Sequence, residues 1–112
     1  MIIVTGGAGC IGSATVWALN KRGIKDIILV NGVDHPEKKK NIAALNYFAL
    51  EDKEIFQDRI KNIKTPWSID AIIHLGGCSS TIERDEAFLT KTNFSYTKSL
   101  ATYALNKDIR FI

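Results

Sequence analysis

Three glycines near the start of the chain have the spacing of a phosphate-binding turn. Gly6, Gly9 and Gly12 follow the pattern G-x-x-G-x-x-G. An apolar, β-branched run at residues 2–4 precedes them, and a stretch suited to a helix, residues 10–22, follows them. A strand, a glycine turn and a helix in this order direct backbone N–H groups and a helix N-terminus at a pyrophosphate. The motif therefore indicates dinucleotide binding rather than an ordinary glycine-rich turn.

The three glycines have different predicted roles in such a turn. Gly6 permits the tight turn off the strand, and Gly9 leaves out the side chain that would obstruct the phosphates. Gly12 lets the helix pack close to the sheet. These roles require a strand before the motif and a helix after it, so the prediction depends on the elements around it.

A second group of polar residues follows the next apolar run, residues 27–30. Asn31 and Gly32 stand where a dinucleotide fold that selects NAD usually has an acidic residue for the ribose 2′-hydroxyl. A neutral amide does not repel a 2′-phosphate, and lysines follow at residues 38–40. The site therefore favours NADP, with NAD possible and Asp34 as a substitute carboxylate. Taken alone, the lysine run is more often a solvated face.

Other chemistry-bearing residues are few. His74 ends a predicted buried strand, where a hydrogen-bonded core histidine is expected rather than a catalytic base. Cys10 and Cys78 are too few for a disulfide framework or a closed zinc site, so no metal site is predicted. Reduced thiols are expected, as in a cytoplasmic protein.

The elements that would position these residues alternate between strands and helices. Strands are expected at residues 2–4, 27–30, 46–50, 70–75 and 110–112, and helices at 10–22, 36–40, 53–62 and 83–107. Asp52 is expected to cap helix 53–62, and helix 83–107 is expected to break near residues 90–92. The alternation predicts an α/β fold, a Rossmann-type doubly wound parallel sheet of order 3-2-1-4 with a fifth strand begun.

Apolar periodicity predicts which helix faces are buried. The inward positions of the last two helices are expected to be Ile55, Phe56, Ile60 and Ile63, and then Phe94, Thr97, Leu100, Ala101, Ala104 and Leu105. Trp17 and Trp67 are interpreted as packing residues.

Composition excludes several classes of protein. The 112 residues allow one domain, with 46% hydrophobic and 24% charged residues and a net charge of +3. No basic helix suggests nucleic acid, and no apolar run approaches the ~20 residues that span a bilayer. Because the chain ends within the expected fifth strand, residues 1–112 are predicted to be the N-terminal part of an NAD(P)-binding domain, without a substrate domain.

Two stretches of the sequence resemble the extended short-chain dehydrogenase/reductase family. Residues 5–12 read T-G-G-A-G-C-I-G, and residues 72–81 read I-I-H-L-G-G-C-S-S-T. Within that family the whole chain resembles the ADP-L-glycero-D-manno-heptose 6-epimerases. The segments that fall at matching spacing are M-I-I-V-T-G-G-A-G-x-I-G-S, A-L-N-K-R-G-I-K-D-I, D-K-E-x-F and C-S-S-T. The glycine motif marks the superfamily, whereas C-S-S-T is more specific.

By position, the resemblance implies a set of cofactor contacts. The pyrophosphate turn would contain Gly6, Gly9, Cys10, Ile11 and Gly12. Asn31 and Gly32 would meet the adenosine ribose, and Lys38 and Lys53 the phosphate-bearing end of the cofactor. Without the resemblance, Lys53 could simply begin a helix.

A second implied group follows the fourth strand. The loop over the ribose and pyrophosphate would contain Leu75, Gly76, Gly77, Cys78 and Ser79. Residues 79–81 could equally cap the next helix. Asn93 matches a structural asparagine of the superfamily, and the cofactor contact there falls on either Asn93 or Thr92.

The resemblance also implies a reaction. A full-length member would use NADP to oxidise ADP-heptose at C6 and return hydride to the opposite face, within cytoplasmic lipopolysaccharide core biosynthesis and in a homo-oligomer. Its catalytic Ser or Thr and Tyr-x-x-x-Lys pair would follow residue 112, so this chain alone is expected to be inactive. Tyr103 and Lys107 have that spacing, but their helix places them away from the cofactor side.

Two other functions stay open. The chain could be part of another nucleotide-sugar epimerase or dehydratase, an alternative that the C-S-S-T stretch disfavours. It could also be a non-catalytic NAD(P)-binding module.

Overall fold

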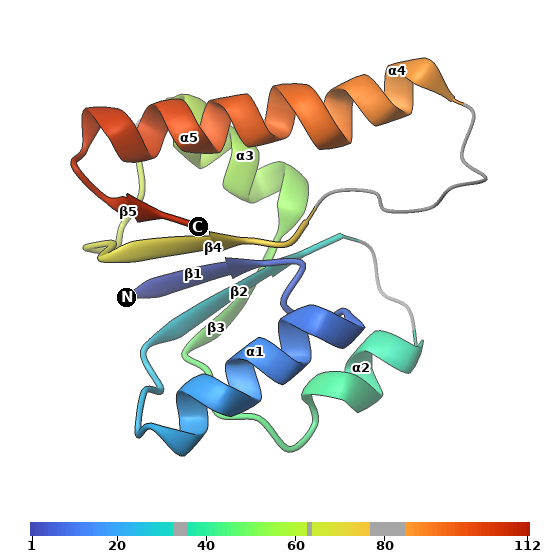
Figure 1. Ribbon diagram of the computed structural model, residues 1–112, viewed down its shortest axis with the longest axis vertical. Coiled ribbons are helices and arrows are strands. Elements are labelled where there is room, and N and C mark those ends of the chain that lie inside the picture. The colour runs from blue at the N-terminus through green and yellow to red at the C-terminus, as the bar shows by residue number, and fades with distance from the viewer. Residues whose placement is uncertain (33–35, 63, 77–84) are drawn as a thin grey trace.

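A computed structural model describes residues 1–32, 36–62, 64–76 and 85–112, in which strands and helices alternate (Figure 1). The strands are β1 (Ile2–Thr5), β2 (Ile27–Asn31), β3 (Ala49–Asp52), β4 (Ala71–His74) and β5 (Arg110–Phe111). The helices are α1 (Cys10–Lys21), α2 (Pro36–Ile42), α3 (Lys53–Lys61), α4 (Glu86–Leu89) and α5 (Tyr96–Asn106), and a π-helical segment, η1 (Thr90–Ser95), joins α4 to α5.

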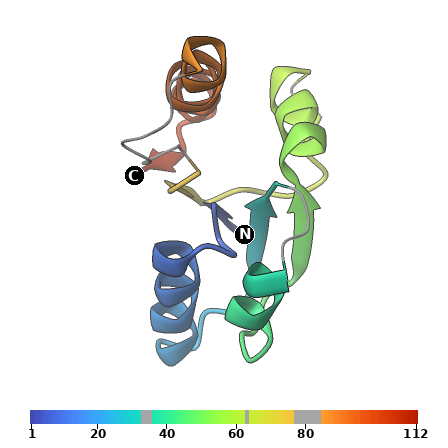
Figure 2. The ribbon, with the colours of Figure 1, turned by 90° about the vertical axis from the view of Figure 1, so that its right-hand side faces the viewer.

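The strands form one parallel sheet of order β3-β2-β1-β4-β5, which confirms the predicted order. Helices cover both faces. Figure 2 shows α1 and α2 on one side of the sheet and α3 and α5 on the other. The predicted doubly wound α/β fold is therefore confirmed, and all parallel strands present their carboxyl ends at the same edge.

The core consists of one apolar layer on each face of the sheet. In β2 the layers alternate, with Ile28 and Val30 in the cluster beneath α3 and α5, and Ile27 and Leu29 in the cluster beneath α1 and α2. All four residues are buried, as expected of a central parallel strand covered on both faces. This burial explains why the sequence shows a continuous apolar run rather than alternation.

Local signals set two element boundaries. Asp52 caps α3 as predicted, because its side chain accepts hydrogen bonds from the backbone N–H groups of Glu54 at 2.8 Å and Ile55 at 3.2 Å. β3 begins and ends later than the predicted strand 46–50, because its pairing with β2 continues to the Asn31–Asp52 register position. Asp52 thus ends the strand and begins the helix.

The predicted helix faces are partly wrong. Phe56, Ile60, Leu100 and Ala104 are buried, but three predicted core residues are exposed: Ile55 at 52%, Phe94 at 61% and Leu105 at 82%. Tyr96 and Tyr103 occupy the core beneath α5 instead. Phe94 lies in η1, which begins at the predicted break near residues 90–92 and whose π-helical turns do not follow the 3.6-residue period. Ile63 lies outside the described residues.

The two tryptophans differ in their surroundings. Trp67 packs against the core cluster, as predicted. Trp17 is 56% exposed, and the Lys21 Nζ lies 5.2 Å from its ring centroid. The prediction that Trp17 is a packing residue is wrong, since its ring is more than half exposed and belongs to neither core cluster.

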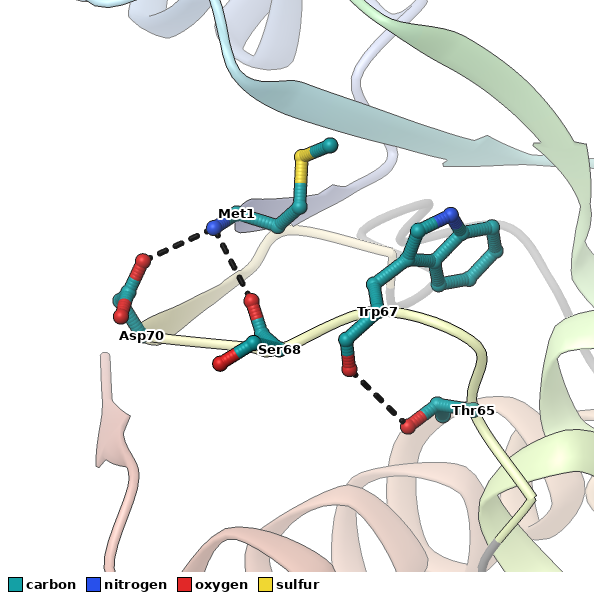
Figure 3. A network of polar contacts seen from close by, with 5 residues as sticks. All are labelled: Met1, Thr65, Trp67, Ser68 and Asp70. Atoms are coloured by element: carbon teal, nitrogen blue, oxygen red, sulfur yellow. Dashed lines mark hydrogen bonds and ion pairs between the residues drawn. The ribbon is translucent and has the colours of Figure 1, made fainter.

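The amino end of β1 is tied to the segment before β4 (Figure 3). The Met1 ammonium donates to the Ser68 carbonyl at 3.0 Å and forms an ion pair with an Asp70 carboxylate oxygen at 2.8 Å. The Asp70 N–H donates in turn to the Met1 carbonyl at 2.8 Å. These contacts hold the edge of the sheet opposite to the one that carries the candidate site.

Candidate cofactor-binding site

A pocket of about 400 Å³ lies at the carboxyl edge of the sheet. Its lining residues come from the glycine turn, the ends of β2 and β4, and helices α2, α3 and α5: Gly6, Gly9, Val30, Asn31, Gly32, Lys38, Lys53, Leu75, Gly76 and Tyr96. All of these except Val30 and Tyr96 were proposed from the sequence as cofactor contacts. The structure therefore gathers into one pocket residues from six separate parts of the chain.

The glycine turn is shaped by two close approaches of backbone to backbone. Gly6 has a φ of +69°, and a Cβ there would lie 2.6 Å from the Leu75 carbonyl oxygen. A Cβ on Gly12 would collide with the backbone of Gly6. Gly12 therefore brings the helix close to the turn, whereas the glycine spacing alone predicts a role in packing against the sheet.

The start of α1 has no side-chain cap. Gly9 is its N-cap residue, and its first turn contains no acidic residue. The first N–H groups of a helix lack intrahelical partners and carry a partial positive charge. A ligand anion can satisfy them, so the missing cap is consistent with the predicted pyrophosphate position.

Several predicted contacts lie outside the pocket lining. Cys10 and Ile11 are exposed in the first turn of α1, and Ile11 is 70% exposed. Asn93 is an exposed residue of η1. Gly77, Cys78 and Ser79 lie outside the described residues.

A hydrogen-bonded chain through Thr5 holds the β4 end of the pocket. The buried Thr5 Oγ1 accepts from the N–H groups of Leu75 at 3.0 Å and Gly76 at 3.1 Å, and it lies 2.6 Å from His74 Nδ1. With both lone pairs of Oγ1 engaged, the hydroxyl hydrogen goes to Nδ1. His74 therefore carries its proton on Nε2, which donates to Thr97 Oγ1 at 2.8 Å. Sequence reasoning missed this role of Thr5.

His74 is a structural histidine, as predicted. Burial lowers its pKa, and the positive charge of Lys53 lowers it further. Its ring meets Tyr96 edge-on at 5.1 Å between centroids and stacks on Phe111 at 6.0 Å. A neutral imidazole bonded through both nitrogens has no free position for acid–base chemistry.

Two lysines give the pocket its charge. Lys38 comes from α2 and Lys53 from α3. Burial lowers the pKa of Lys53, Glu54 opposes this shift, and Lys91 and Lys38 add to it. No carboxylate lines the pocket among the described residues. An anionic ligand would relieve the repulsion between the two ammonium groups.

Tyr96, like Val30, is a pocket residue that sequence reasoning missed. It is 1% exposed, and its hydroxyl has no hydrogen-bond partner among the described residues. The Lys53 Nζ lies 5.1 Å from the centroid of its ring. Tyr96 precedes the buried Leu100 by one helical turn, and this spacing could have placed it on the inner face of α5.

Together the sheet order, the glycine turn and the pocket at the carboxyl edge define a Rossmann-type α/β protein. The chain belongs to the NAD dependent epimerase/dehydratase family, whose sequence model matches residues 2–112. No helix in the described part of the chain is long and apolar enough to cross a bilayer. Within the same residues, no group of three or more His, Cys, Asp or Glu side chains could hold a metal ion.

Curated relatives and solved structures agree with this membership. The chain is 45% identical to an ADP-L-glycero-D-manno-heptose-6-epimerase of Fusobacterium nucleatum and 43% identical to one of Nitratidesulfovibrio vulgaris, in both cases over all 112 residues. These matches cover 34% and 35% of the relatives, so the chain spans about a third of their length. A UDP-glucose 4-epimerase structure from Thermotoga maritima superposes with a TM-score of 0.79 at 26% identity, over 98% of this chain and 36% of that one.

Proposed function

We propose that this chain binds the adenosine and pyrophosphate parts of NADP, as the N-terminal cofactor-binding portion of an epimerase that acts on ADP-heptose. The observation that carries the proposal is the pocket in which the glycine turn, the end of β2 and two lysines meet. The substrate class rests on the name of the two relatives, which are 43% and 45% identical over the whole chain.

The pocket residues fit such a cofactor. The pyrophosphate would lie against the uncapped start of α1, at Gly9, Cys10 and Ile11. The adenosine ribose would lie at the end of β2, beside Asn31 and Gly32. The close approach of backbone at the glycine turn leaves no room for a side chain there, as a phosphate cradle requires.

The preference for NADP over NAD follows from charge. Asn31 ends β2 with a neutral amide, which donates to the Gly32 carbonyl at 3.3 Å. Lys38 and Lys53 line the same pocket. A carboxylate at Asn31 would repel a 2′-phosphate, whereas an amide beside two ammonium groups accommodates one.

This chain would bind and orient the cofactor rather than move protons. When bound, the cofactor would supply hydride transfer to and from the substrate carbon, and the residues of this chain would hold its adenosine and pyrophosphate parts. The described residues near the pocket offer no suitable acid or base: His74 is neutral and bonded through both nitrogens, and burial raises the pKa of the Tyr96 phenol far above neutrality. Tyr103 is hydrogen-bonded to Thr65 at 2.9 Å, which supports excluding it from catalysis.

Calorimetric titration with NADP and NAD tests the proposal. The chain should bind NADP more tightly than NAD, and Asn31→Asp should shift the ratio of dissociation constants toward NAD by about tenfold, or about 1.4 kcal/mol. Asn106→Asp makes the same charge change at an exposed position outside the pocket and should leave the ratio unchanged. An unchanged ratio in Asn31→Asp would refute the assignment of Asn31 to the 2′ position. Binding of neither dinucleotide at millimolar concentration would refute cofactor binding itself.

A further inference from the structure

The Tyr96 hydroxyl is a buried polar group without a partner in the described part of the chain. The residue is 1% exposed, and the hydroxyl oxygen is hidden from solvent and bonds to none of the described residues. Leaving a buried hydroxyl unpaired is unfavourable, because its hydrogen bonds to water are lost on folding and not replaced. Such a group in a native core calls for a specific explanation, and a ligand is one.

The position of Tyr96 points to the pocket described above. The residue is part of the pocket lining, together with Lys53, Gly76 and the end of β2. A Cβ placed on Gly76 would lie 3.3 Å from Tyr96 Cε1, so the edge of the ring lies directly against the end of β4. His74 packs edge-on against the ring and fixes its orientation.

We propose that the Tyr96 hydroxyl forms a hydrogen bond with the adenosine half of a bound dinucleotide. This inference rests on the proposed function and assigns a contact that neither the glycine motif nor the lysines provide. The adenosine half is indicated because Tyr96 shares its pocket with Asn31 and Gly32, and the end of the second strand is where such folds hold the adenosine ribose.

Lys53 lies over the Tyr96 ring, and a ligand that reaches the hydroxyl would displace its ammonium group. Its Nζ lies 5.1 Å from the ring centroid, and its flexible four-carbon stem can change rotamer at little cost. A phosphate in the pocket would attract the ammonium group away from the ring. Burial raises the pKa of the Tyr96 phenol, so the hydroxyl keeps its proton and can either donate or accept.

The test compares two buried tyrosines of the same helix. Tyr96→Phe removes the unpaired hydroxyl, and Tyr103→Phe removes one that is hydrogen-bonded to Thr65. Thermal unfolding and calorimetric affinity are measured on the whole 112-residue chain. The ligands are 2′-phospho-ADP-ribose, which lacks the nicotinamide, and nicotinamide mononucleotide, which lacks the adenosine.

We expect the substitution of Tyr96 to raise the stability of the chain and to weaken its binding of the ligand. Tyr96→Phe should raise the midpoint of unfolding by about 4 °C, because an unsatisfied buried group is removed. It should also weaken 2′-phospho-ADP-ribose binding about fivefold, because one hydrogen bond is lost. Tyr103→Phe should lower the midpoint and leave that affinity unchanged. A purely structural role for the Tyr96 hydroxyl would not combine a higher unfolding midpoint with weaker binding of 2′-phospho-ADP-ribose.

Three results would overturn the inference. The first is wild-type affinity of Tyr96→Phe for 2′-phospho-ADP-ribose, with the wild-type chain binding normally. The second is a loss confined to nicotinamide mononucleotide, which would place the hydroxyl at the other half of the cofactor. The third is no binding of either ligand by the wild-type chain, and this result would overturn the proposed function as well.

Discussion

At the scale of single residues, the direction of one hydrogen bond decides what His74 can do. Thr5 Oγ1 accepts from two backbone N–H groups and therefore donates to His74 Nδ1. A proton added to Nδ1 would face a hydroxyl oxygen whose lone pairs are already engaged. The same arrangement fixes the Leu75–Gly76 backbone at the pocket, so the histidine contributes to the shape of the site rather than to proton transfer.

This arrangement predicts a dependence of stability on pH. The folded-state pKa of His74 is lowered below its ordinary value of 6.5, by burial and then by Lys53. As pH falls below about 6.5, the unfolded chain binds a proton that the folded chain binds less readily, so the free energy of unfolding decreases. Stability should be fully present above this value and be lost progressively toward the lowered pKa. Urea unfolding between pH 8 and pH 5 measures the effect.

The variant His74→Asn provides the control for this prediction. Its side chain keeps a hydrogen-bonding amide but does not titrate in this range. The variant should be less stable at every pH, and its loss of stability between pH 7 and pH 5.5 should be smaller than that of the wild-type chain. Equal losses in both proteins would show that His74 is not the responsible group.

At the scale of elements, the start of α1 packs on the turn that precedes it. Gly12 is buried, and the absence of a Cβ lets the first turn of α1 contact the Gly6 backbone. The close approach sets the direction of α1 and hence of its uncapped N–H groups. The helix therefore points at the pocket because of contacts within the motif, before any packing against the sheet is considered.

Substitution of Gly12 tests this arrangement. Gly12→Ala should destabilise the chain by about 3 kcal/mol, because the new Cβ collides with backbone that cannot shift without opening the turn. Gly32→Ala is the matched control, since a Cβ there meets no atom of the described residues within 4 Å, and it should change stability by less than about 0.5 kcal/mol. Urea unfolding measures both variants. Equal stabilities of the two would contradict the proposed packing.

At the scale of the whole molecule, the site is formed by elements that are far apart in the sequence. The sheet brings the ends of β1, β2 and β4 to one edge, and α3 and α5 close the pocket from one face. The chain spans about a third of the length of its curated relatives. The described residues of the chain form a pocket at the carboxyl edge of the sheet, and its cofactor role is the proposal made above.

This composition of the site predicts that the 112-residue chain has no epimerase activity. An assay with NADP and ADP-heptose, following inversion at C6 by NMR, should show no turnover above the cofactor-free control. Such chemistry needs a positioned acid–base group, and the phenol of Tyr103 is hydrogen-bonded to Thr65 outside the pocket lining. Turnover that Tyr103→Phe abolishes would show instead that Tyr103 acts as that group.

The sequence by itself determined the order of the strands in the sheet, the glycine turn and the cap of α3, whereas the bounds of β3 were set by its pairing with β2. These features depend on local patterns: a β-branched run buried on both faces, glycines at fixed spacing, and an aspartate before a helix. Because parallel strands carry their carboxyl ends to one edge, the order of elements also placed Asn31 and Leu75 near Gly6. The cofactor role of these residues stays a prediction.

Only the tertiary structure decided how the buried side chains are paired and which of the predicted core positions are in fact exposed. Thr5 and His74 are hydrogen-bonded although they are 69 positions apart in the sequence. Phe94 is exposed and Tyr96 buried, because a π-helical segment precedes α5 and changes the phase of its inner face. The pairing of side chains depends on the register of the strands and the phase of the helices, and both are set by contacts between distant segments. A local sequence pattern therefore could not specify the unpaired hydroxyl of Tyr96 or the tautomer of His74.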